Sequence, residues 1–203
     1  MNIGMTRREF AALAGVAMLS APTAAQTGEL ITRATPGSGE QLPAVGLGTA
    51  YVFDRDDEAT RQKAAAVVEA LVAGGGSLID TSSVYGDAEA VLGAVIASGQ
   101  LREKLFIATK LELPDAAELK RSQTRLKTEK FGLLQLHNVR DPQQSLEQFR
   151  SWKEQGACRY IGITSPRHAD FRCCGAKNLI SYRSTIPSMT ARPKSASCHS
   201  LPR

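Results

Sequence analysis

The chain has 203 residues, of which 42% are hydrophobic, a composition that suits one soluble domain with a sizeable core. Its formal net charge of +5 comes from the tail: residues 172–203 hold six Lys or Arg and no acid, so residues 1–171 carry 19 basic and 20 acidic side chains. This balance argues against a nucleic-acid surface, and the four cysteines lack the spacing of a zinc or redox motif, so we expect no metal.

The first 25 residues are typical of an export signal. Arg7 and Arg8 precede an apolar run over residues 11–21, and small residues follow at 23–25. The paired arginines followed by Phe10 resemble a twin-arginine signal, which predicts the twin-arginine export machinery as a partner and a periplasmic or exported location. The apolar run is too short for a stable membrane span. The alternative is a cytoplasmic amphipathic helix.

The first predicted elements lie between residues 28 and 73. Residues 28–43 are polar and suit a hairpin that closes one end of a barrel, and residues 45–49 are a first strand candidate with two glycines. Residues 57–73 read as a helix, because apolar side chains recur on one face and Gly74-Gly75-Gly76 follows.

Residues 77–93 predict a buried strand, a tight turn and a helix. Asp80 ends the short apolar strand, and Tyr85 follows five residues later. Gly86 and Asp87 supply the turn and a helix N-cap candidate. Polar groups at the carboxyl end of a strand are where β/α barrels place their chemistry.

Strands and helices continue to alternate along the chain. We expect strands at 105–109, 131–136 and 160–163, a helix at 115–127 and another marked by Leu146, Phe149 and Trp152. This alternation indicates a parallel α/β fold. Lys110 and His137 end two of the strands, as Asp80 does, and such residues converge on one mouth in a barrel but spread along an edge in a doubly wound sheet. The sequence contains no G-x-G-x-x-G or Walker motif.

Five segments, in order and at the right spacing, resemble the aldo-keto reductases: residues 46–49, 79–89, 106–110, 133–138 and 159–164. The resemblance covers about Leu42 to Phe171. It implies an α/β fold, a (β/α)8 TIM barrel of which residues 26–171 form about the first five units. It also implies an NADPH-dependent oxidoreductase that reduces an aldehyde or ketone.

The resemblance maps a catalytic tetrad onto Asp80, Tyr85, Lys110 and His137. Hydride arriving at a carbonyl carbon leaves charge on oxygen, which needs a proton donor, and Tyr85 takes that role. Lys110 is expected to lower the pKa of the phenol, with Asp80 holding the lysine charged and His137 orienting the substrate.

Five residues are expected at the cofactor: Gly48, Thr49, Asp80, Thr164 and Ser165. The last two stand where the family hydrogen-bonds the nicotinamide amide. Gly132 and Pro166 depart from the usual pattern of the family and weaken this assignment relative to the tetrad.

The barrel pattern stops after Phe171. Residues 172–203 contain three cysteines, no acid and no amphipathic period, although a further strand is due. Read one nucleotide out of frame with permissible codons, they can encode a strand with a glutamine and an acid-rich helix. We therefore interpret the segment as frameshifted or disordered and the reductase as truncated and impaired.

Two other functions remain open at this point. A non-catalytic half-barrel remnant or binding module would keep the fold without turnover. An aldolase-like barrel enzyme would use Lys110 as a Schiff base, which borohydride trapping with a carbonyl compound would detect.

Overall fold

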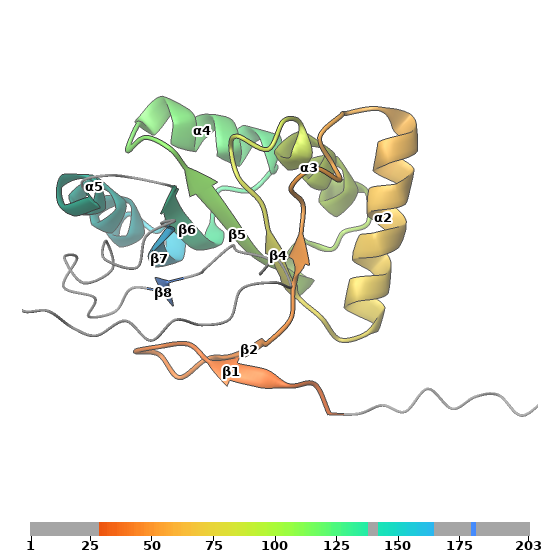
Figure 1. Ribbon diagram of the computed structural model, residues 1–203, viewed down its shortest axis with the longest axis horizontal. Coiled ribbons are helices and arrows are strands. Elements are labelled where there is room, and N and C mark those ends of the chain that lie inside the picture. The colour runs from red at the N-terminus through yellow and green to blue at the C-terminus, as the bar shows by residue number, and fades with distance from the viewer. Residues whose placement is uncertain (1–28, 138–141, 165–179, 182–203) are drawn as a thin grey trace, which may run out of the picture. The chain divides into compact units, whose positions relative to one another are not determined.

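The computed structural model describes residues 29–137, 142–164 and 180–181. The contacts divide the chain after Leu30, and every element below belongs to the unit that begins at Ile31 (Figure 1). The predicted signal peptide, Ser165 and all of residues 172–203 except Ile180 and Ser181 lie outside the described residues.

The described residues form short strands at the start and then strands that alternate with helices. The strands are β1 (Thr32–Ala34), β2 (Gln41–Pro43), β3 (Leu47–Gly48), β4 (Leu78–Asp80), β5 (Phe106–Leu111), β6 (Phe131–His137), β7 (Cys158–Thr164) and β8 (Ile180–Ser181). The helices are α2 (Glu58–Ala73), α3 (Ala88–Ser98), α4 (Ala116–Arg125), α5 (Pro142–Glu154) and the 3-10 turn η1 (Arg102–Lys104).

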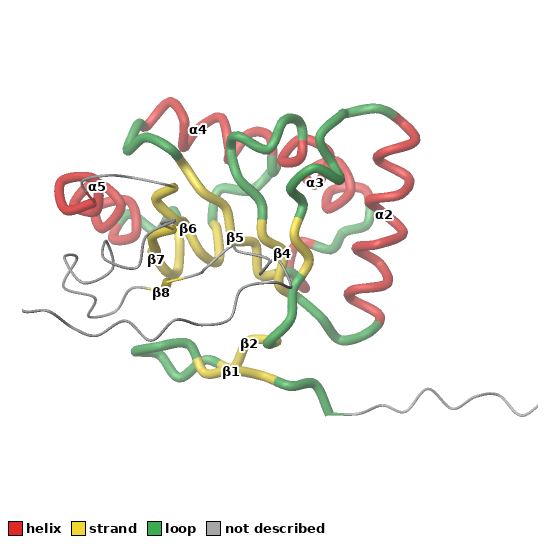
Figure 2. The backbone as a smooth tube through the Cα atoms, viewed as in Figure 1, coloured by secondary structure: helices red, strands yellow, loops and turns green. Residues whose placement is uncertain are grey.

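The six strands from β3 to β8 form one parallel sheet in which spatial order follows chain order (Figure 2). A doubly wound sheet would reverse its strand order, whereas a β/α barrel adds each strand beside the last. Helices α2 to α5 lie on one side of this sheet (Figure 1). The α/β fold of TIM-barrel type is thus confirmed, and the described residues supply six of its strands.

Local sequence explains where the helices begin. The Asp57 carboxylate accepts a hydrogen bond from the Thr60 amide at 2.7 Å and caps α2, which matches the predicted helix closely. Asp115 caps α4 in the same way, by accepting from the Ala117 amide at 3.0 Å. Asp87 occupies the N-cap position of α3 as predicted, but its carboxylate makes no cap hydrogen bond and accepts from the Asp56 amide instead.

The two faces of the sheet bury different things because side chains alternate along each strand. The outer face packs on the helices in the main core, to which Ile79, Ile107 and Leu134 belong. The inner face carries a smaller apolar cluster of Phe106, Ala108 and Leu133, with Leu42, Leu78 and Tyr160 packed against it.

The predicted N-terminal hairpin is present and closes the amino end of this interior. Strands β1 and β2 pair antiparallel, and the Glu40 carboxylate beside them accepts hydrogen bonds from Arg159 and Tyr160 on β7. Strand β8, inside the segment for which the sequence indicated no element, adds a two-residue parallel partner to β7.

Candidate active site

The carboxyl half of the interior is polar. Lys110 shares the inner face of β5 with Phe106 and Ala108, because the three are spaced two apart. Asp80 ends β4 and His137 ends β6, and parallel pairing places Lys110 opposite Gln135 and His137 opposite Thr164. The structure thus brings three of the predicted tetrad residues to one end of the sheet.

Lys110 and Asp80 form a buried ion pair. The Lys110 Nζ donates to Asp80 Oδ2 at 2.6 Å and to the Thr81 carbonyl at 2.9 Å, and its side chain is fully buried. Burial lowers the pKa of Lys110, and the charge and hydrogen bond of Asp80 oppose that shift. Gln135 Nε2 donates to the other oxygen of Asp80 at 3.4 Å. The arrangement fixes the ammonium inside the barrel.

Tyr85 reaches the same place from the loop between β4 and α3. Its amide donates to the Ser82 carbonyl at 3.2 Å, and Gly86 then turns the chain with φ of 55°. A Cβ at Gly86 would lie 2.7 Å from the Asp54 carbonyl oxygen, so the turn after Tyr85 requires glycine. The Lys110 Nζ lies 5.0 Å from the centroid of the Tyr85 ring. The Tyr85 and His137 rings are edge-on to each other, with their centroids 6.3 Å apart.

The predicted lowering of the Tyr85 pKa by Lys110 is wrong for this structure. Burial raises the pKa of Tyr85, and the nearby Asp80 carboxylate adds to the rise. The ammonium lies over the ring face, and its charge is neutralised by Asp80 at 2.6 Å, which accounts for the missing stabilisation of a phenolate. Tyr85 is consequently a protonated phenol at neutral pH.

His137 is held as a polar, half-buried group. Its Nδ1 lies 2.9 Å from Thr164 Oγ1, a contact that orients the ring. Burial lowers the pKa of His137, and the positive charge of Lys110 lowers it further. Both effects favour the neutral imidazole, which retains one ring N–H for donation.

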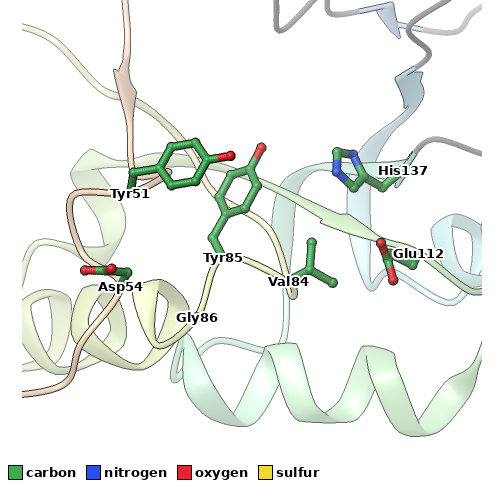
Figure 3. Close-up of a pocket in the computed structure, with 7 residues that line it drawn as sticks. All are labelled: Tyr51, Asp54, Val84, Tyr85, Gly86, Glu112 and His137. Atoms are coloured by element: carbon green, nitrogen blue, oxygen red, sulfur yellow. The ribbon is translucent and has the colours of Figure 1, made fainter.

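Tyr85 and His137 both line a cavity of about 350 Å³. Figure 3 shows their side chains across it from each other, with the Tyr51 ring beside Tyr85. The full lining is Tyr51, Asp54, Val84, Tyr85, Gly86, Glu112 and His137. The cavity is therefore lined by two tetrad members and by the carboxylates of Asp54 and Glu112 from two further loops, and none of these seven residues is a lysine or an arginine.

The residues predicted to bind the cofactor differ in how accessible they are to a ligand. The Thr49 hydroxyl is buried and donates to Thr81 Oγ1 at 2.9 Å, so it ties β3 to β4 and is not directed into the cavity lining. A Cβ at Gly48 would meet nothing within 4 Å, which leaves open space above the end of β3. Thr164 lies at the end of β7 beside His137, and Ser165 is outside the described residues.

A buried polar atom tests whether a nicotinamide fits here. Gln135 Oε1 is buried and has no hydrogen-bond partner within the described part of the chain, although it lies in the polar interior beside Asp80. An unpaired acceptor of this kind suits a carboxamide N–H. With the open space at Gly48 and the Thr164 hydroxyl, the residues present fit the nicotinamide end of a dinucleotide.

Sequence reasoning missed four polar residues of the site: Gln135, Tyr51, Asp54 and Glu112. Gln135 could have been found from the alternation in β6, because it stands two residues before His137 on the same face. Tyr51, Asp54 and Glu112 lie beyond strand ends, where the fold of each loop decides whether a side chain reaches the cavity.

The described ranges contain neither a metal-binding cluster nor a membrane-spanning helix. No group of three or more His, Cys, Asp or Glu there could hold a metal ion. No helix within those ranges has the length and apolar character needed to cross a membrane.

Comparison with known proteins places this geometry in a family. Residues 44–185 match the aldo/keto reductase family. An aldo-keto reductase of Mycobacterium tuberculosis is 30% identical over 158 residues, which are 73% of this chain and 52% of that protein. One from Mycolicibacterium smegmatis is 32% identical over 132 residues, 60% of this chain and 44% of that protein. The chain spans about half the length of these curated relatives.

A solved structure resembles the fold directly. The crystal structure of an aldo-keto reductase from Klebsiella pneumoniae, in complex with NADPH, has a TM-score of 0.61 and 27% sequence identity. The similarity covers 70% of this chain and 53% of that one.

Proposed function

We propose that this chain, which belongs to the aldo/keto reductase family, takes part in NADP(H)-dependent reduction of a small aldehyde or ketone, with Tyr85 as the proton donor. The observation that carries the proposal is the convergence of Asp80, Tyr85, Lys110 and His137 from three strands and one loop at one end of the sheet. Tyr85 and His137 of this group line the cavity. The NADPH complex of the Klebsiella pneumoniae relative supports the choice of cofactor.

Bound NADPH would supply the hydride; the residues of this chain manage the proton. As the carbonyl oxygen gains charge, the Tyr85 hydroxyl donates its proton to it. The raised pKa of Tyr85 ensures that the proton is present at neutral pH. The cavity next to the phenol is where the carbonyl group would lie.

His137 and Lys110 have distinct roles in this proposal. The neutral His137 ring faces Tyr85 and donates a hydrogen bond to the substrate oxygen, which orients it toward the phenol. Lys110, held by Asp80, lies 5.0 Å from the centre of the Tyr85 ring and keeps the phenol in place for proton transfer. Asp80 and Thr164 would also contact the nicotinamide end of the cofactor.

The test replaces one hydroxyl at a time. Tyr85→Phe removes the proposed acid and is expected to lower kcat for NADPH-dependent reduction of a benzaldehyde by 100-fold or more, to about the level without acid catalysis. Tyr160→Phe makes the same change on a phenol at the amino end of the interior, where its hydroxyl donates to the Glu40 carboxylate, and should leave kcat within about twofold. Equal activity of Tyr85→Phe and the unchanged chain would exclude Tyr85 as the donor.

The alternative is a barrel fragment that binds without turnover. It is favoured if the chain binds NADPH saturably by fluorescence but consumes none with any aldehyde supplied. Absence of both binding and turnover would contradict the proposed function altogether.

Export through the twin-arginine pathway is a separate proposal, supported by the Arg7-Arg8 pair and the apolar run that follows. Residues 1–30 fused to a folded fluorescent protein should direct it to the periplasm. A twin-lysine variant of the same fusion should stay in the cytoplasm.

A further inference from the structure

Glu118 links two segments of the candidate active site. It lies in the first turn of α4, is 5% exposed, and contributes nothing to the cavity lining. Its Oε1 accepts from the Ser83 hydroxyl at 2.6 Å and from the Glu112 amide at 3.2 Å, and its Oε2 accepts from the Leu113 amide at 3.0 Å. One carboxylate thus joins the loop after β4 to the loop after β5.

The two segments that it joins are the ones that carry Tyr85 and Lys110. Ser83 stands two residues before Tyr85, and Glu112 stands two residues after Lys110. The Ser83 amide also donates to the Lys110 carbonyl at 3.0 Å, so Ser83 contacts β5 through its backbone and α4 through its side chain. Ser83 therefore connects the loop that carries Tyr85 both to the strand that carries Lys110 and to helix α4.

Helix capping accounts for only part of this arrangement. A carboxylate in the first turn of a helix is favoured by the exposed amides and the helix dipole, and hydrogen bonds to the Glu112 and Leu113 amides order the loop that enters α4. Neither role requires a bond to Ser83, which belongs to a different loop. The short Ser83 contact is the element that capping leaves unexplained.

We propose that Glu118, through Ser83, is a positioning residue that holds the Tyr85 loop in place over Lys110 and so sets the efficiency of proton transfer. The inference rests on the proposed function, because it assigns Glu118 a part in the same reaction. In this proposal, Ser83 and Glu118 act on the reaction through Tyr85 and contact neither the substrate nor the cofactor.

Removal of the Ser83 hydroxyl separates this role from capping. Ser83→Ala keeps the backbone bond to Lys110 and both amide bonds of Glu118, and removes only the side-chain bond between Ser83 and Glu118. We expect kcat to fall about fivefold with KM changed less than twofold, because a small displacement of a reacting group costs rate rather than binding. Ser83→Thr retains the hydroxyl and should restore most of kcat.

Ser98→Ala is the matched control. The Ser98 hydroxyl donates to the Val95 carbonyl at the end of α3, away from both loops. The same loss of one hydroxyl there should change neither kcat nor KM. Glu118→Gln, which keeps the side-chain shape but weakens acceptance from three donors, should lower kcat at least as far as Ser83→Ala.

Titration of Tyr85 gives a readout that does not need turnover. Tyrosine labelled at the phenol carbon reports its own ionisation by NMR, and Tyr85→Phe assigns the signal. The charged and titratable groups that face Tyr85 or share its cavity are Asp80, Lys110, His137, Tyr51, Asp54 and Glu112. Burial raises the pKa of Tyr85, so loosening the loop in Ser83→Ala should move that pKa back toward its ordinary value, whereas Ser98→Ala should not.

The outcomes are distinguishable. If the unchanged chain shows no turnover, the proposed function fails, and the titration alone decides whether Ser83 and Glu118 position Tyr85. An unchanged Tyr85 titration in both Ser83→Ala and Glu118→Gln overturns the positioning role, whatever happens to stability. A fall in kcat that Ser83→Thr does not restore also overturns it.

Discussion

The two ends of the barrel interior are built on the same strands, but one end is apolar and closely packed and the other is polar and opens into a cavity. At the amino end, Phe106, Ala108 and Leu133 pack on each other, and the β1–β2 hairpin covers them. At the carboxyl end, Lys110, Gln135 and His137 continue the same inward rows, and a cavity opens among the loops.

The difference shows how the inward-facing side chains of one strand can serve the stability of the fold at one end and the chemistry of the site at the other. Along β5, positions 106 and 108 are apolar and position 110 is an amine, all facing inward. The apolar end lowers the free energy of the fold by burying surface, whereas the polar end carries a buried charge that is tolerated only because Asp80 pairs with it. The predictions below test whether the two ends are separable in this way.

The largest effect is expected from breaking the buried ion pair. Lys110→Met leaves the Asp80 carboxylate without its cation in a site where both are largely buried, and we expect a loss of about 3–5 kcal/mol in the free energy of unfolding. Urea denaturation followed by circular dichroism measures it. The double variant Asp80→Asn with Lys110→Met should recover much of that loss, and a double variant as unstable as the single one would contradict the pairing.

A change at the apolar end should cost stability and leave the site intact. Leu133→Ala deletes a buried side chain that packs against Phe106 and is expected to cost about 2–4 kcal/mol in the same assay. The NMR signal of Tyr85 should be unchanged, since Leu133 lies at the opposite end of the interior. A shifted Tyr85 pKa in this variant would show that the two ends are coupled.

The hairpin closure should contribute much less. Arg159 and Tyr160 lower the pKa of Glu40 against the effect of burial, with the Arg159 hydrogen bond as the largest influence. Because the folded pKa is below the unfolded one, this stability is present above the unfolded pKa and is lost as pH falls through the folded value. Both side chains of the ion pair are partly exposed, so Glu40→Gln should cost at most about 1 kcal/mol near pH 7, and this cost should shrink as the pH falls through the folded pKa of Glu40.

The smallest effect is electrostatic and lies at the cavity. The Glu112 carboxylate opposes the lowering of the His137 pKa, so Glu112→Gln should lower that pKa further. Imidazole signals in a nitrogen-correlated NMR titration measure the shift. Glu103→Gln, on η1, removes the same charge outside the cavity lining and should leave His137 unchanged.

Much of the fold followed from the sequence because its signals are local. The apolar face and the triple glycine of the first long helix predicted α2 almost to the residue, and strand–helix alternation predicted the parallel sheet. Asp80, Lys110 and His137 were placed together because parallel strands bring their carboxyl ends to one edge. The role of each site residue, and of residues 1–25, stays a prediction.

The electrostatics of the site needed the tertiary structure. Sequence pattern put Lys110 near Tyr85, but the direction of the Tyr85 pKa depends on whether the ammonium meets the hydroxyl or the ring face, and on how much charge Asp80 neutralises. A pKa reports distances of a few ångströms and the water excluded around them, and neither quantity is contained in residue spacing.

The sequence by itself determined how strands and helices alternate along the chain and which residue types end the strands, because periodicity and turn chemistry act over a few neighbouring positions. Only the tertiary structure decided which loop side chains reach the cavity and that Glu118 bonds to Ser83. The Ser83–Glu118 bond joins residues 35 apart in the chain, and its geometry depends on how α4 packs beside β5 rather than on either segment alone.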